Sequence, residues 1–187
     1  MAERVYICLF DLNAYDKRVA PALRKYQNQY DPSAAVAELR DIAGKPSTLA
    51  KDDSQHWIDA LAPDAGYKPS PDTVHELADI LIRNLCIPQM QEIDSLTPYL
   101  SEHSEWFSDL MDGGEELAGG RLEFTYGSGA LIATRQQVRQ FLDEVNRVPP
   151  PDGKLAAECE NLRKLLKTAA TNPSYTLLKT GVAAANP

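Results

Sequence analysis

The chain of 187 residues lacks the common catalytic motifs. No serine lies in a Gly-x-Ser-x-Gly pentapeptide, which argues against the nucleophile turn of an α/β-hydrolase. The glycines at positions 113, 114, 119 and 120 form neither a Gly-x-Gly-x-x-Gly fingerprint nor a phosphate loop ending in Gly-Lys-Ser/Thr. Nucleotide binding by these routes therefore has no support in the sequence.

Cysteine is scarce and widely spaced. The three cysteines are Cys8, Cys86 and Cys159, and each lies among apolar residues. Because no Cys-x-x-Cys pair exists, neither a zinc knuckle nor a thioredoxin-type redox site is expected. We expect three free, buried thiols in a reducing compartment, with no bound metal and no cofactor.

Long hydrophobic runs are also missing. The N-terminal run has six apolar residues before Asp11, which is too short for a signal-peptide core or a membrane span. No later run approaches 18 apolar residues. We therefore expect a soluble, cytoplasmic protein that does not act at a membrane.

The charge balance is acidic, with a net charge of −8 and a pI of about 4.9. An acidic surface repels phosphate backbones, so binding of DNA or RNA by charge neutralisation is disfavoured. The same repulsion disfavours an anionic membrane surface. A basic protein is the electrostatically easier partner.

Length and periodicity favour one α+β domain over residues 1–187, rich in helix, with a small mixed sheet of three to four strands. A proline-rich break at 148–152 is expected before a C-terminal helix and tail. Expected strands are 5–10, a hairpin of 121–126 and 130–133 around Gly127, and an edge strand at 175–178. Helices are expected after a cap at Asn13, and at 32–44, around Trp57, 71–88, 97–113, after a Thr134–Gln137 capping box, and at 155–169.

Polar residues follow the first expected strand. Asp11 and Asn13 stand where open α/β sheets place metals and nucleophiles, and Asp109 and Asp112 are the acids best suited to join them. A Mg²⁺-dependent hydrolase or phosphotransfer enzyme is one hypothesis, although Asn13 supplies no anionic ligand. The structural alternative is a strand end followed by a helix cap.

The histidines offer two further candidates. His103 is expected on the apolar face of its helix near Trp106, where it is either a half-buried structural histidine or a catalytic group needing a carboxylate. His75 and Asp79 stand four residues apart on one helix, as two metal ligands or as a solvated pair.

Residues 109–145 resemble the C-terminal half of the YfbM-like family of small bacterial proteins with no established activity. The likeness rests on GGEEL at 113–117, on Tyr126-Gly127, and on the Thr134 cap followed by Gln137-Val138. The resemblance implies mixed α and β structure. It makes Glu115, Glu116 and Tyr126 the first positions to inspect for a shared pocket.

We expect a non-enzymatic, acidic interaction protein that caps a basic protein partner, as toxin-neutralising immunity proteins do. Candidate binding residues are Glu115, Glu116, Tyr126, Trp106 and His103. The alternative is the carboxylate enzyme described above. A third hypothesis is a homodimer that buries an exposed apolar patch around Trp57 or Trp106.

Overall fold

The computed structural model describes residues 3–45, 51–62, 70–112 and 122–183. The chain is α+β: helices predominate and four strands form one antiparallel sheet, which confirms the predicted class. Its contacts divide it into two compact units. The first, the sheet unit, comprises Met1–Phe10, Gln89–Leu122 and Gly127–Pro187; the second, the helical unit, comprises Asp11–Pro88 and Glu123–Tyr126.

The sheet has the strand order β2-β1-β4-β3, so β1 and β4 are central and β2 and β3 are edges. The strands are β1 (Glu3–Asp11), β2 (Gln89–Glu92), β3 (Ser128–Ile132) and β4 (Tyr175–Ala183). β1 pairs antiparallel with β2, Tyr6 opposite Glu92 and Leu9 opposite Gln89. The sheet is antiparallel, in place of the predicted mixed directions.

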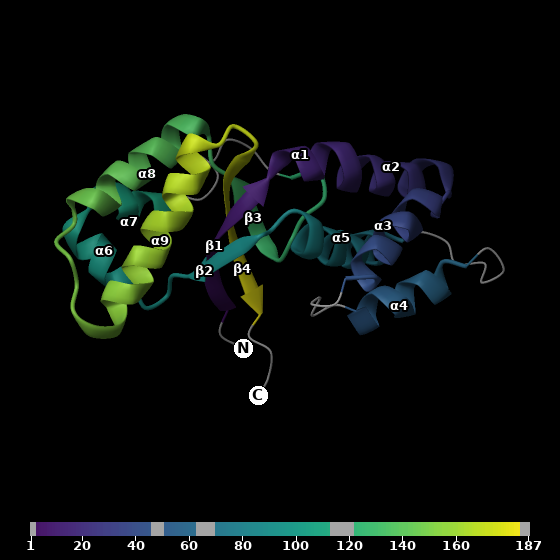
Figure 1. Ribbon diagram of the computed structural model, residues 1–187, viewed down its shortest axis with the longest axis horizontal. Helices are drawn as coiled ribbons and strands as arrows, with labels where there is room; N and C mark the ends of the chain where they lie inside the picture. Colours follow the sequence, from purple (N-terminus) through teal and green to yellow (C-terminus); the bar gives the residue numbers. More distant parts are fainter. Residues whose placement is uncertain (1–2, 46–50, 63–69, 113–121, 184–187) are drawn as a thin grey trace. The chain divides into compact units, whose positions relative to one another are not determined.

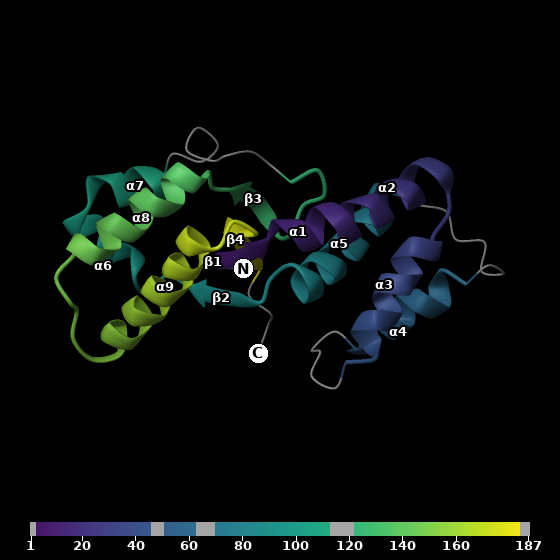
Figure 2. The same ribbon diagram turned by 45° about the horizontal axis from the view of Figure 1, so that its top comes forward.

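Four helices belong to the sheet unit: α6 (Thr97–His103), α7 (Glu105–Asp112), α8 (Arg135–Arg147) and α9 (Gly153–Thr171). Figures 1 and 2 show α8 and α9 side by side, and α9 also contacts β2 and β4. Their apolar faces form a single core with Ile7 and Leu9 of β1. Its other buried members are Ile93, Leu96, Leu100, Phe107, Val138, Phe141, Val145, Val148, Cys159, Leu162, Leu165, Leu166, Ala169 and Leu177.

The helical unit contains α1 (Leu12–Ala14), η1 (Tyr15–Val19), α2 (Ala20–Gln29), α3 (Ser33–Ala43), α4 (Lys51–Ala60) and α5 (Pro71–Leu85). The first three are successive parts of one helical run, and η1 is a π-helical turn in which the Ala20 N–H donates to the Tyr15 carbonyl. Pro21 explains the turn, because its ring clashes with the carbonyl four residues earlier and the ladder widens to avoid it.

Several helix boundaries follow the local signals. Ser70 caps α5 by accepting from Thr73 N at 3.1 Å, with Pro71 in the first turn. Thr134 and Gln137 form the predicted capping box of α8. α8 ends at Arg147 and α9 begins at Gly153, so residues 148–152 separate the two helices. The description as one domain stays a prediction.

The predicted hairpin is wrong. Ser128 to Ile132 form β3, which pairs with β4 and not with the preceding segment. In that segment Leu122, Phe124 and Tyr126 are buried while Glu123 and Thr125 are exposed, without a ladder. The alternation of apolar and polar residues in this segment therefore reflects alternating burial of the side chains and not strand pairing. β4 is longer than predicted and central, because it lies between β1 and β3.

The predicted helix over 97–113 is interrupted at Ser104. This residue is extended and buried, and its hydroxyl oxygen accepts from Phe107 N at 3.1 Å, so it begins α7. A serine side chain that satisfies a free helix N–H favours such a new start. The last predicted residue, Gly113, lies outside the described residues.

Gly127 adopts a left-handed conformation (φ 61°) immediately before β3. A Cβ there would lie 2.5 Å from both the Gly181 carbonyl oxygen and the Thr180 Oγ1. Gly153 has nearly the same conformation (φ 60°), but a Cβ there would meet nothing within 4 Å. A side chain at Gly153 would meet backbone strain alone, whereas a side chain at Gly127 would meet the same strain and also a steric clash with β4.

We expect Gly127→Ala to lower the free energy of unfolding by about 2–4 kcal/mol, the sum of left-handed strain and a forced contact. Gly153→Ala, the matched control, should cost about 1 kcal/mol. Urea unfolding followed by circular dichroism measures both. Equal losses would show that β4 does not approach Gly127 this closely.

Candidate functional site

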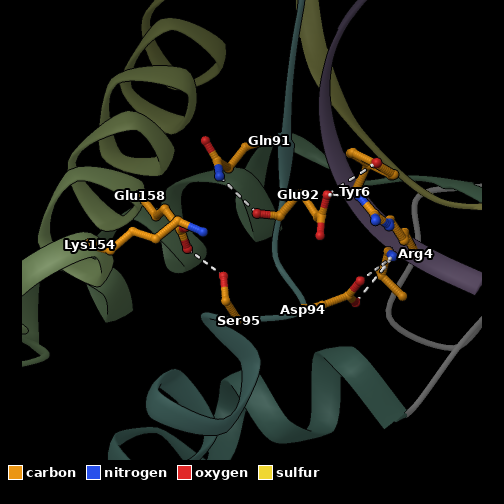
Figure 3. Close-up of polar contacts among 9 residues, drawn as sticks. Arg4, Tyr6, Gln91, Glu92, Asp94, Ser95, Lys154 and Glu158 are labelled. Atoms are coloured by element: carbon orange, nitrogen blue, oxygen red, sulfur yellow. Dashed lines mark hydrogen bonds and ion pairs between the residues drawn. The ribbon is translucent and has the colours of Figure 1, made fainter. Parts of the chain in front are cut away.

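The edge strand β2 carries a set of fixed polar side chains, drawn in Figure 3. The Glu92 carboxylate accepts from Arg4 at 3.1 Å and from the Tyr6 hydroxyl at 3.3 Å, both on β1. Just beyond the strand, the Asp94 carboxylate accepts from the Val5 N–H at 3.2 and 3.3 Å. These contacts anchor two acidic side chains at the edge of the sheet.

The start of α9 contributes a third acid beside this edge. Glu158 accepts from the Ser95 hydroxyl and forms an ion pair with Lys154 at 3.3 Å (Figure 3). The hydrogen bond from Ser95, followed by the Lys154 contact, holds the pKa of Glu158 below its usual value. Glu158 therefore stays ionised under mildly acidic conditions.

A second polar group surrounds the junction of α6 and α7. The Ser104 hydroxyl donates to Glu144 of α8 at 3.0 Å. His103 is exposed, and its Nδ1 donates to the Tyr99 carbonyl at 2.9 Å. The predicted half-buried position of His103 is wrong, because the helix ends at this residue and its apolar face does not continue to Phe107.

Trp106 is half-buried, with its ring 5.7 Å from the Phe141 ring, so one part of the indole packs on the core. Glu102 and Glu105 flank this region and are exposed. Neither carboxylate forms a hydrogen bond or an ion pair with any residue in the described ranges. They are therefore available to charges from outside the chain.

The acidic charge of the chain is concentrated in one segment. Residues 84–120 contain eight acidic residues and no lysine or arginine. The rest of the chain has 19 acidic and 19 basic residues, so it is neutral. The whole net charge of −8 thus lies in a segment of 37 residues, which we call the acidic segment. Its members are Glu92, Asp94, Glu102, Glu105, Asp109, Asp112, Glu115 and Glu116.

The remaining predicted site residues are dispersed. Glu115 and Glu116 lie outside the described residues. Asp109 and Asp112 belong to α7. Tyr126 is buried in the helical unit, so it does not line an open surface.

Asp11 has a structural role. Its Oδ1 accepts from Ala14 N at 3.0 Å, so Asp11, not Asn13, caps the first helix. In the part of the chain that the structure describes, no three His, Cys, Asp or Glu side chains are grouped to hold a metal. The carboxylate enzyme, which requires Asp11 to converge with other acids, stays a prediction.

We expect Asp11→Ala to lower the free energy of unfolding by about 1 kcal/mol, because the cap is lost. Asp11→Asn should leave stability nearly unchanged, since an asparagine oxygen can cap equally well. Thermal melting compares the three proteins. A destabilised Asn variant would mean that the charge of Asp11, and not its hydrogen bond, is what the fold uses.

In the helical unit, Thr125 joins the predicted His75–Asp79 pair of α5. His75 Nδ1 lies 3.0 Å from Thr125 Oγ1, and its Nε2 lies 3.7 Å from Asp79 Oδ2. His75 and Thr125 border a depression of about 360 Å³ that Gln27 and Glu123 also line. The wide Asp–His gap, together with the exposure of His75 and Thr125, fits a surface network better than a nucleophile with its base. Only the alternating burial of 122–126 could have signalled that Thr125 faces α5.

The same short segment is held on α1–α2 by two further contacts. The Tyr15 hydroxyl oxygen accepts from Phe124 N at 3.1 Å, and burial raises the pKa of this phenol. Arg24 forms a bidentate pair with Glu123, its Nε lying 2.8 Å from Oε2. A separate depression of about 480 Å³, lined by Val36, Ile58 and Leu61, lies between α3 and α4.

All three cysteines are free and buried. Burial raises the pKa of Cys8 to about 12. Burial, together with the nearby Asp11 carboxylate, raises the pKa of Cys86 to about 12. Burial also raises the pKa of Cys159. Because the thiolate is the nucleophile, none of these groups is set up for thiol chemistry.

We expect the folded protein to resist iodoacetamide at pH 8, where a thiol of pKa 12 is ionised in only about one molecule in ten thousand. Unfolding in urea should expose all three thiols to rapid alkylation, which mass spectrometry counts. The raised pKa values of Cys8 and Cys86 also predict a contribution to stability that is complete below about pH 9 and lost as the pH rises toward 12. Fast alkylation of the folded chain would contradict the burial.

Trp57 does not provide the exposed patch proposed for a homodimer. It is buried in the helical unit, with 6% of its surface exposed. Within the described ranges, none of the helices has both the length and the apolar character needed to cross a membrane.

Comparison with protein-family models, with curated proteins and with solved structures finds no match to this chain.

Proposed function

We propose that this chain is a non-enzymatic interaction protein whose acidic segment binds a basic protein partner, in the manner of immunity proteins that neutralise a toxin. The observation that carries the proposal is the confinement of the entire net charge to 37 residues. Uniform acidity would serve solubility alone, whereas one acidic segment on a neutral chain directs binding to one part of the surface.

The exposed side chains of α6 and α7 support the proposal. Glu102 and Glu105 are free of partners in the described ranges, so binding a cation breaks no existing pair. Trp106, the residue after Glu105, adds a half-exposed aromatic ring that packs on Phe141 of the core. Aromatic rings beside charged groups are typical of the energetically important parts of protein interfaces, and arginine stacks well on them.

The proposal also covers the cellular compartment of the protein and its resemblance to a bacterial family. Three buried free thiols suit a reducing cytoplasm. The resemblance of residues 109–145 to the YfbM-like family is supported by one of its elements, the Thr134–Gln137 cap. We propose a cytoplasmic protein of bacterial type on these grounds. A homodimer through the Trp106 region is the competing assembly.

The first test measures binding of an arginine-rich decapeptide by fluorescence anisotropy in 20 mM and 150 mM salt. We expect Glu102→Gln/Glu105→Gln to weaken binding roughly threefold to tenfold, since each exposed ion pair contributes about 0.2–1 kcal/mol. Higher salt should weaken binding to the unsubstituted chain, because screening shortens the range of these charges.

The matched control is Asp72→Asn/Glu76→Gln, which removes the same charge from two exposed positions of α5. It should change the affinity less than twofold. Equal losses in both variants would mean that the peptide responds only to net charge, and the proposed site would be abandoned. No binding at 20 mM salt would end the proposal itself.

A further inference from the structure

We propose that the basic partner binds as an extended strand added to the outer edge of β2, which pairs with no further strand in the described ranges. This inference rests on the proposed function. β2 is one of the two edges of the sheet. Native sheets protect such edges because unpaired backbone groups can pair with another chain. The two edges of this sheet are protected differently.

The β3 edge is irregular. Its register with β4 shifts between Ser128 and Leu131, and such an irregularity bends a strand and hinders further pairing. β2 pairs regularly with β1 over four consecutive residues, Gln89 to Glu92. It contains no lysine, arginine or proline. β2 is short, but it is the edge that a further strand can join.

The backbone of β2 offers its outer groups at two residues. Ile93 N donates to the Val5 carbonyl at 3.0 Å, which sets the alternation of the antiparallel ladder. By that alternation Gln91 and Gln89 bond to β1, whereas the N–H and C=O groups of Met90 and Glu92 point away from it. In agreement, the Glu92 carbonyl accepts from the Gln91 side-chain amide at 2.8 Å instead of from a strand (Figure 3).

The side chains at this edge indicate the chemistry of the added strand. Met90 is 40% exposed, although it is a large apolar residue. Glu92 is two residues further on the same face, and Arg4 and Tyr6 hold its carboxylate in place. An extended peptide with alternate arginine and apolar residues could place an apolar side chain against Met90 and a guanidinium beside Glu92 and Asp94.

Charge makes a second copy a poorer occupant. Two β2 edges side by side would bring two acidic segments together, each carrying the full net charge of −8. Like charges facing across paired strands are destabilising. A basic strand instead gains attraction at the same positions, so the edge and the charge favour the same partner.

The probe is an eight-residue peptide of alternating arginine and valine, with N-methylation of every second backbone amide as its control. The methylated peptide keeps its charge but loses the donors on one edge. We expect the unmethylated peptide to bind at least tenfold more tightly. It should also slow hydrogen exchange of the Met90 and Glu92 amides at least tenfold, as measured by NMR.

A variant of the protein gives the reciprocal test. Met90→Pro removes an outward N–H that the sheet does not use, which edge strands tolerate. It should weaken peptide binding at least tenfold, whereas Met90→Val, which keeps the N–H, should stay within threefold. If the proline variant does not fold, the comparison of the methylated and unmethylated peptides still tests whether the partner binds as an added strand.

The outcomes separate the two proposals. Equal binding of both peptides, still weakened by Glu102→Gln/Glu105→Gln, would overturn strand addition and leave the acidic interaction protein standing. Binding of neither peptide would overturn both. Concentration-dependent protection of Met90 and Glu92 without any peptide would identify a second copy as the occupant and overturn the basic strand.

Discussion

The rest of the sheet unit depends on the burial of β1. Residues 5–10 carry no charged side chain, and alternate residues are buried on opposite faces: Ile7 and Leu9 on one, Cys8 and Phe10 on the other. Such a strand requires cover on both faces and a partner along both edges. β4 supplies one partner and β2 the other, and the core of α8 and α9 covers Ile7 and Leu9.

This requirement explains why a polar tetrapeptide is a strand at all. Gln-Met-Gln-Glu has little intrinsic preference for extended structure, so the backbone of β1 dictates its conformation. The position also brings the acidic segment to the sheet, since Glu92 and Asp94 bond to β1. Packing and charge are thereby coupled: the residues that complete the central strand begin the segment that holds the net charge.

Sequence reasoning succeeded where the cause of a structure is local. The Ser70 cap and the Thr134–Gln137 box satisfy backbone groups within one turn, and the apolar run of β1 has few other interpretations. It failed where the cause is distant. β2 depends on β1, the break at Ser104 is reinforced by Glu144, and Thr125 meets His75 across 50 residues. Residue spacing also could not predict that Asp11 caps a helix or that Tyr126 is buried in the core.

The π-turn at Tyr15–Val19 sets the rotational phase of the helix that follows it. Each residue of an α-helix advances the face by about 100°. A chain shortened by one residue here could close an ordinary ladder, but it would turn Leu23 and Tyr26, both buried, away from their present neighbours. The wide turn is therefore a phase adjustment. It lets a helix that must accept Pro21 keep its apolar side chains, as far as Tyr26, directed inward.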